Sequence, residues 1–127
     1  MKMNELQRIL YIEDEADIRA VALLALEVVG GFTVKACASG QEALAEAEAF
    51  APDLILSDVM MPEMDGPTTI KALRSLSSLT QTPVIFMTAK VQTDEIEHFK
   101  SLGVKDVIAK PFDPMTLADQ IRRIWAS

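Results

Sequence analysis

The pattern of apolar and polar positions divides the chain into short apolar runs that alternate with longer amphipathic segments. Four of the runs are continuously apolar or nearly so: residues 9–12, 54–57, 84–87 and 107–109. Such runs are typical of parallel strands covered on both faces, and their alternation with helix-like segments predicts a parallel sheet between two layers of helices. A fifth run, residues 33–37, alternates instead and therefore predicts a strand at the edge of that sheet.

Residues typical of helix ends lie between these runs. Ser39, with a glutamate three positions later, forms a capping box. We expect helices to begin at Thr93, which precedes two acidic residues, and at Asp113, which precedes Pro114 at a first helical position. Gly103 is placed to end the fourth helix.

Composition limits the chain to one domain and narrows its class of partner. A chain of 127 residues, half of them apolar, forms one globular core, and we expect a single domain over residues 1–127 with no output domain. A net charge of -7 argues against nucleic acid and anionic membrane as partners, but allows metal ions and basic protein surfaces. With one cysteine and no signal-like or membrane-spanning apolar segment, the chain is predicted to be cytoplasmic.

Polar residues of unusual type follow four of the apolar runs. Glu13 and Asp14 follow residues 9–12, Asp58 follows residues 54–57, Thr88 follows residues 84–87, and Lys110 follows residues 107–109. Ligands of open α/β sheets bind beyond the carboxyl ends of the strands. These side chains are therefore expected to meet at that end of the sheet. Carboxylates crowded there must protonate, separate or bind a cation. Mg²⁺ prefers oxygen ligands, so the cluster predicts a magnesium site.

The motifs that hold these residues resemble those of a known family. Residues 11–15, 58–66, 87–89 and 110–112 are similar, in order and spacing, to the receiver domains of bacterial two-component response regulators, including the chemotaxis type. The similarity extends over essentially the whole chain. It implies a flavodoxin-like α/β fold with five parallel strands in the order 2-1-3-4-5 and five flanking helices.

The resemblance also implies a role for each site residue. Asp58 would accept a phosphoryl group from a phosphohistidine and become 4-aspartylphosphate, with Thr88 and Lys110 contacting the phosphoryl oxygens. Mg²⁺ would be held by Asp14, Asp58 and the backbone carbonyl of Met60, with Glu13 acting mainly through metal-bound water. The family implies a cis Lys110–Pro111 peptide, as in only about 5% of such bonds in folded proteins.

By the same resemblance, the chain would act as a signalling switch rather than as an enzyme on other substrates. Its donor would be a histidine kinase or a histidine phosphotransfer protein, and its target an unknown protein. Phosphorylation would alter the face formed by the fourth helix, fifth strand and fifth helix, or the adjacent loops. Two alternatives stay open: a receiver domain excised from a hybrid histidine kinase, and an interaction module that is never phosphorylated.

Two rival classes conflict with the residues. A haloacid-dehalogenase-type hydrolase requires a second aspartate two positions after the nucleophile, where this chain has Met60. A flavodoxin-like cofactor binder requires a phosphate loop after the first strand, where Glu13 and Asp14 would repel phosphate.

Three other reactive residues are not expected to act in the site. We expect His98 to lie on the surface, Cys37 to be a small core residue and Lys90 to face solvent.

Two further expectations concern surfaces that respond to partners or to phosphorylation. In the first helix, Ile18, Ala22, Ala25 and Val29 form one apolar stripe, while Leu23 and Leu24 fall on or beside the opposite face, where they either contact a partner or pack on flanking helices. Many receivers carry an aromatic residue three positions before the conserved lysine. Val107 stands there instead, and it has no ring to reorient.

Overall fold

Five parallel strands form the centre of the computed structural model, which describes residues 5–127. The strands are β1 Arg8–Ile12, β2 Thr33–Cys37, β3 Leu54–Asp58, β4 Val84–Thr88 and β5 Asp106–Ala109. Their order is β2-β1-β3-β4-β5, which confirms the predicted order and places β2 at an edge. All four pairings are parallel, so the carboxyl ends of the strands lie together.

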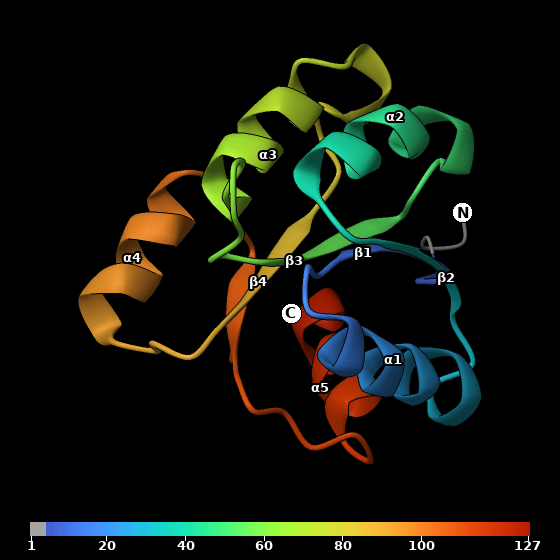
Figure 1. The fold of residues 1–127 in the computed structure, drawn as a ribbon. Helices are drawn as coiled ribbons and strands as arrows, with labels where there is room; N and C mark the ends of the chain where they lie inside the picture. The colour runs from blue at the N-terminus through green and yellow to red at the C-terminus, as the bar shows by residue number, and fades with distance from the viewer. Residues whose placement is uncertain (1–4) are drawn as a thin grey trace.

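Helices cover both faces of this sheet, as predicted. The helical segments are α1 Ala16–Leu24 with its π-helical continuation η1 Ala25–Val29, α2 Gly40–Phe50, α3 Gly66–Arg74, the 3-10 turn η2 Ser77–Leu79, α4 Thr93–Ser101 and α5 Leu117–Ala126. Figure 1 shows α2 and α3 on one side of the sheet and α1 and α5 on the other. The five expected α-helices are therefore present, and two short segments of other helix types accompany them.

Alternate strand residues supply two separate cores. In β1, Leu10 and Ile12 belong to the core that includes residues of α2, α3 and α4, whereas Ile9 and Tyr11 belong to the core that includes residues of α1, η1 and α5. All four side chains are fully buried. Because successive strand residues face opposite sides of a sheet, a strand covered on both faces has no position at which a polar side chain is easily accommodated. This explains why the polar residues of the chain gather at the strand ends.

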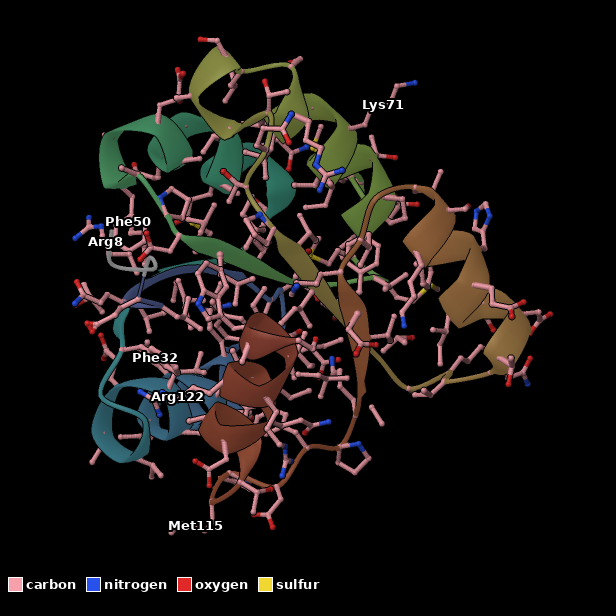
Figure 2. The ribbon with its side chains drawn as sticks, turned by 180° about the vertical axis from the view of Figure 1, so that it is seen from behind. Arg8, Phe32, Phe50, Lys71, Met115 and Arg122 are labelled. Atoms are coloured by element: carbon pink, nitrogen blue, oxygen red, sulfur yellow. The ribbon has the colours of Figure 1, made fainter. Side chains whose placement is uncertain are left out.

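The end of the sheet opposite those polar residues is held by two arginine–phenylalanine contacts. The guanidinium of Arg8 lies 4.2 Å from the ring centre of Phe50 and donates to the Phe50 carbonyl. The guanidinium of Arg122 lies 4.2 Å from the ring centre of Phe32. Figure 2 labels both pairs, which lie far apart along the sequence but side by side in the fold. Cation–π contacts of this kind contribute about 0.5–1 kcal/mol each at exposed sites.

Two predicted helix ends are confirmed. The Ser39 hydroxyl accepts a hydrogen bond from the Glu42 amide at 3.1 Å, while the Glu42 carboxylate accepts from the Ala38 amide at 2.8 Å. The reciprocal bond of the capping box thus forms one residue earlier than in the usual motif. Gly103 has φ +92° and follows the last turn of α4, as expected of a C-terminal glycine.

Of the two other predicted helix starts, one is confirmed and one differs by a few residues. α4 begins at Thr93, as predicted, although Gln92 in the cap position makes no side-chain cap bond. Pro114 is not at the first helical position of α5, which begins at Leu117. The reason is that the Asp113 carboxylate accepts from the Met115 amide at 2.9 Å and so forms a separate turn before the helix.

The apolar stripe predicted for the first helix is correct over its first half and wrong at Val29. Ala22 and Ala25 are buried, but Val29 is 47% exposed, and Leu26 takes its place in the core. The backbone widens after Leu24 into a π-helical turn, in which the Gly30 amide donates to the carbonyl of Ala25, five residues earlier. This extra residue per turn rotates the following side chains away from an α-helical register.

Gly66 allows α3 to begin against the end of β3. A Cβ atom at this position would lie 2.6 Å from the Asp58 carbonyl oxygen and 3.0 Å from the Cα atom of Val59. Both neighbours are backbone atoms, so neither can rotate away. The Gly66 amide also donates to the Val59 carbonyl at 2.8 Å, which fixes the chain direction after Asp58.

We predict that Gly66→Ala destabilises the fold by about 1–3 kcal/mol, because the added methyl group must displace backbone at the end of β3. Urea unfolding of the two proteins measures the difference. Thr68→Ala is the matched control, since Thr68 is exposed two positions along the same helix and should cost less than about 0.5 kcal/mol. Equal stability of Gly66→Ala and wild type would show that this close contact does not constrain the fold.

Candidate functional site

Three carboxylates converge at the carboxyl ends of β1 and β3. Ile12 and Ser57 are in register, so the next residues, Glu13 and Asp58, emerge side by side, with Asp14 adjacent. One oxygen from each carboxylate lies within 4.8 Å of the others. Glu13 is 0% exposed and Asp58 is 5% exposed. The sequence-predicted acidic cluster is therefore assembled by the fold.

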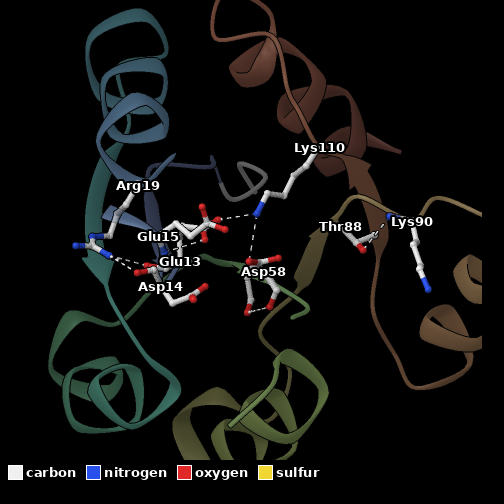
Figure 3. Close-up of polar contacts among 9 residues, drawn as sticks. Glu13, Asp14, Glu15, Arg19, Asp58, Thr88, Lys90 and Lys110 are labelled. Carbon is white, nitrogen blue, oxygen red and sulfur yellow. Dashed lines mark hydrogen bonds and ion pairs between the residues drawn. The ribbon is translucent and has the colours of Figure 1, made fainter. Parts of the chain in front are cut away.

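Lys110 neutralises part of this negative charge. Its ammonium lies 3.0 Å from Glu13 Oε1 and 3.2 Å from Asp58 Oδ2, bridging the two carboxylates (Figure 3). The lysine follows β5, and its amide donates to the Thr88 carbonyl at 2.9 Å, which continues the ladder between β4 and β5. The peptide between Lys110 and Pro111 is cis, as expected from the family resemblance.

The pKa values within this cluster follow from burial and from the ion pairs. Burial raises the pKa of Glu13, and the hydrogen bonds from Lys110 and from the Glu15 amide only partly offset it. Burial alone would lower the pKa of Lys110, but the hydrogen bond to Glu13 and the charges of Asp58 and Glu13 outweigh burial and raise it. Lys110 is therefore held as a cation, and burial makes the Glu13 carboxylate costly to keep ionised.

The donor set fits a hard divalent cation. Asp14 Oδ1 is buried and, within the described residues, has no hydrogen-bond partner. An unpartnered carboxylate oxygen is costly unless something else binds it. Oxygen ligands of this kind are those that Mg²⁺ prefers, and it typically uses one or two carboxylates together with water and phosphate oxygens. The three carboxylates could therefore hold Mg²⁺.

Thr88 and Met60 stand apart from the carboxylates and Lys110. The hydroxyl of Thr88 accepts from the Lys90 amide at 3.2 Å, and Figure 3 shows both residues to one side of the acidic cluster. The Lys90 side chain is exposed, as expected. Met60, whose carbonyl is a predicted ligand, lies two residues after Asp58 with its side chain exposed. The fold thus brings Thr88 to the neighbouring strand end, where its hydroxyl makes no hydrogen bond to Asp58 among the described contacts.

Arg19 is a site residue that the sequence did not reveal. Its Nη1 donates to the carbonyl of Glu13 at 2.8 Å and lies 3.5 Å from the carbonyl of Asp14 (Figure 3). The sequence predicts only that Arg19 is a charged residue on an amphipathic helix, because it belongs to no recognised motif. Tyr11 was also missed: its hydroxyl is buried and has no hydrogen-bond partner among residues 5–127, and burial, followed by the charges of Glu13 and Asp58, raises its pKa.

Two other reactive side chains have the environments that the sequence predicts. Cys37 is fully buried at the end of β2, and burial raises the pKa of its thiol to about 11. A buried thiol with a raised pKa is a poor nucleophile. His98 is exposed on α4, so it packs in neither core.

An apolar surface borders the acidic cluster on the side of α1. A shallow pocket of about 270 Å³ is lined by Ile18, Val21, Lys110, Pro111 and Phe112, together with Asp17. The surface continues along α1 and η1 through Leu24, which is 62% exposed, and Val28, which is 74% exposed. Large exposed apolar side chains that adjoin a polar site are typical of a protein contact surface.

None of the helices within residues 5–127 is long and apolar enough to cross a bilayer.

The family model for the response regulator receiver domain matches residues 9–122. The chain is 36% identical over 118 residues to a probable transcriptional regulator, ycf27, of Porphyridium aerugineum, covering 93% of this chain and 48% of that protein. It is 34% identical over 125 residues to response regulator Rre1 of Synechocystis sp., covering 98% of this chain and 54% of that protein. The chain spans about half the length of these relatives.

Solved structures show the same fold. The chemotaxis response regulator CheY4 of Vibrio cholerae has a TM-score of 0.85 and 32% identity, covering 94% of this chain and 99% of that one. The signal receiver domain of a histidine kinase from Syntrophus aciditrophicus has a TM-score of 0.75 and 31% identity, covering 94% and 90%. The family model spans nearly the whole chain, and the acidic cluster is typical of the family's phosphoacceptor site. The chain therefore belongs to the family of response regulator receiver domains of two-component signal transduction.

Proposed function

We propose that this chain is a phosphorylation-dependent signalling switch in which Asp58 accepts a phosphoryl group from a phosphohistidine. The observation that carries the proposal is the position of the Asp58 carboxylate at the end of β3, 3.2 Å from the Lys110 ammonium and within a cluster of three carboxylates. A carboxylate at the carboxyl ends of parallel strands is accessible to a ligand and can attack phosphorus. The lysine ammonium beside it can neutralise part of the negative charge of the phosphorylated product.

The transfer exchanges one bond for another at phosphorus. An Asp58 carboxylate oxygen forms the new O–P bond as the N–P bond of phosphohistidine breaks, and the imidazole leaves with the bonding pair and takes up a proton. Catalysis of such transfers rests mostly on positioning and on neutralising the equatorial oxygens. Lys110 would turn from Glu13 and Asp58 to those oxygens, and Thr88 would exchange its bond with the Lys90 amide for a bond to one of them.

Asp14 and Asp58 would bind Mg²⁺ directly, the carbonyl of Met60 would add a third protein ligand, and Glu13 would act mainly through water. Bound there, Mg²⁺ would supply positive charge against the phosphoryl oxygens. The unpartnered Asp14 Oδ1 supports its assignment as a direct ligand. The bonds of Glu13 with Lys110 and with the Glu15 amide support an indirect role for that residue.

The same proposal sets the scope of the activity. The chain would catalyse only its own phosphorylation and dephosphorylation, in the cytoplasm, and residues 1–127 would form one receiver unit. Its donor would be a histidine kinase or a histidine phosphotransfer protein, and its target another protein. The match to a receiver domain of a histidine kinase keeps open the alternative that this unit belongs to a hybrid kinase. The other alternative is an interaction module that is never phosphorylated.

The apolar surface of α1 supports a docking site for the donor. Leu24 and Val28 are exposed, and the pocket lined by Ile18 and Val21 ends at Lys110, so a helix placed there would bring its histidine close to Asp58. Of the two leucines considered from the sequence, Leu24 is the exposed one, whereas Leu23 is half-buried. We therefore assign the contact to Leu24 rather than to Leu23.

We predict that acetyl phosphate with Mg²⁺ adds one phosphoryl group to the wild-type chain and none to Asp58→Ala, because Glu13, the other carboxylate in contact with Lys110, is fully buried and Asp58 is partly accessible. Intact mass spectrometry measures the addition, and loss of the group in hydroxylamine identifies an acyl phosphate. Asp53→Ala is the control, since Asp53 is a carboxylate at the opposite end of β3 and should label like wild type. Labelling of Asp58→Ala, or no labelling of wild type, would contradict the proposal.

We predict that activation moves the Thr88 loop and the start of α4 more than the surface of β5. Val107 is a buried valine in the core that contains Phe86 and Phe99, whose rings pack edge to face at 5.0 Å. A β-branched side chain there has no ring to reorient, so a shift must arise from Thr88, Lys90 and Lys110. Amide chemical-shift changes on adding beryllofluoride and Mg²⁺ measure the response.

The expected pattern has its largest changes at residues 89–93 and small ones at Val107 and on the outer face of α5. Mg²⁺ alone is the control, because it separates cation binding from the response to the phosphoryl analogue. Changes centred on Val107 and α5 would show that the face formed by α4, β5 and α5 responds without an aromatic switch.

A further inference from the structure

Arg19 contacts the backbone of the two residues that begin the acidic cluster. It lies in the first turn of α1, and its Nη1 donates to the Glu13 carbonyl at 2.8 Å and lies 3.5 Å from the Asp14 carbonyl. Figure 3 shows the guanidinium beside the loop, on the side away from Asp58 and Lys110. Among the described residues, no ion pair joins Arg19 to a carboxylate. Its contacts are therefore with the chain that carries the carboxylates, not with the carboxylates themselves.

The loop from Glu13 to Glu15 is also held at its start, where the Glu13 amide donates to the Cys37 carbonyl at 3.0 Å and the Glu13 carboxylate accepts from Lys110. Glu13 lies one residue beyond the end of β1, and Glu15, the cap residue of α1, makes no side-chain cap bond. The Glu15 amide donates to the Glu13 carboxylate at 3.2 Å, and the Arg19 amide donates to the Glu15 carbonyl at 2.9 Å. Without Arg19, the carbonyls of Glu13 and Asp14 would lose the side-chain donor that, among the described residues, joins them to the helix.

We propose that Arg19 is a positioning residue that fixes the loop so that the unpartnered Asp14 Oδ1 is presented to a divalent cation. The inference rests on the proposed function, which assigns Asp14 as a direct ligand. Residues that orient metal ligands without touching the metal typically change its affinity by about 10–100-fold when they are removed. A planar guanidinium suits this role because its donors have fixed directions and its charge is permanent.

Two effects of Arg19 on cation binding have opposite signs, which makes the inference testable. As a positive charge near the cluster, Arg19 repels Mg²⁺, so its removal would tighten binding by electrostatics alone. As a positioning residue, it holds Asp14 in a binding geometry, so its removal would weaken binding. The direction of the change in Mg²⁺ affinity therefore decides between a positioning role and a simple background charge.

The test is a Mg²⁺ titration of wild type, Arg19→Met and Arg122→Met, followed by amide chemical shifts at about 0.1 M salt. Arg122 is a matched control, because its guanidinium also donates to a backbone carbonyl, that of Gly30, and its removal takes away the same charge and a similar bond elsewhere. We expect Arg19→Met to raise the Mg²⁺ dissociation constant about tenfold and Arg122→Met to leave it within about twofold.

The metal-free spectra give a second readout. The amides of Asp14 and Glu15 should shift in Arg19→Met and not in Arg122→Met, before any Mg²⁺ is added. If Arg19→Met does not fold, Arg19→Gln, which also lacks the charge and the guanidinium fork, replaces it with the same expected weakening.

An unchanged or tighter Mg²⁺ affinity in the Arg19 variant would overturn the positioning role, because wild type would still bind the cation. A wild-type protein that does not bind Mg²⁺ at all would overturn the proposed function instead. The two failures are therefore distinguishable in one experiment.

Discussion

Three carboxylates within a few ångströms of one another can all stay ionised only if a nearby cation offsets their mutual repulsion. The other features of the site depend on this constraint. Glu13 is fully buried and Asp58 nearly so, so water cannot supply the screening. Lys110 supplies the charge from β5 by bridging both carboxylates. The cost of breaking a buried ion pair by removing one partner is about 3–5 kcal/mol, and the partial exposure of Lys110 reduces that here. Before phosphorylation, Lys110 therefore balances part of the negative charge of the carboxylates, and a divalent cation or a phosphoryl group can replace these contacts.

The topology of the sheet makes this compensation possible. β1 and β3 are neighbours, which places Glu13 beside Asp58, whereas β5 is separated from β3 by β4. A short side chain after β5 would not reach the carboxylates, but the long side chain of lysine does. Thr88, at the end of the intervening strand, lies to one side of the cluster, and its hydroxyl could exchange its hydrogen-bond partner, because among the described contacts it accepts only from the nearby Lys90 amide. The strand order thus determines how far the side chain at each strand end must reach, and therefore which residue type is suitable there.

The sequence was sufficient for the features that depend on local pattern. The apolar runs predicted the strands, the alternating run at Thr33–Cys37 predicted the edge, and the polar residues after the runs predicted the cluster. Features that depend on tertiary contacts were missed. The π-helical turn at Ala25–Val29 changes which residues face the core, and the pattern of apolar residues in the sequence does not predict it. Arg19 resembles any surface arginine until the fold shows its carbonyl partners.

The central claim is that Lys110 and a divalent cation compensate the same carboxylates, and the measurement that tests it is the stabilisation that Mg²⁺ gives to wild type and to Lys110→Met. Chemical denaturation with and without saturating Mg²⁺ yields the two differences. The account predicts that Lys110→Met is about 2 kcal/mol less stable than wild type without Mg²⁺ and that Mg²⁺ stabilises it more than it stabilises wild type. The exposed Lys90, replaced in Lys90→Met, should change neither value. Equal stabilisation of wild type and Lys110→Met by Mg²⁺ would contradict the claim.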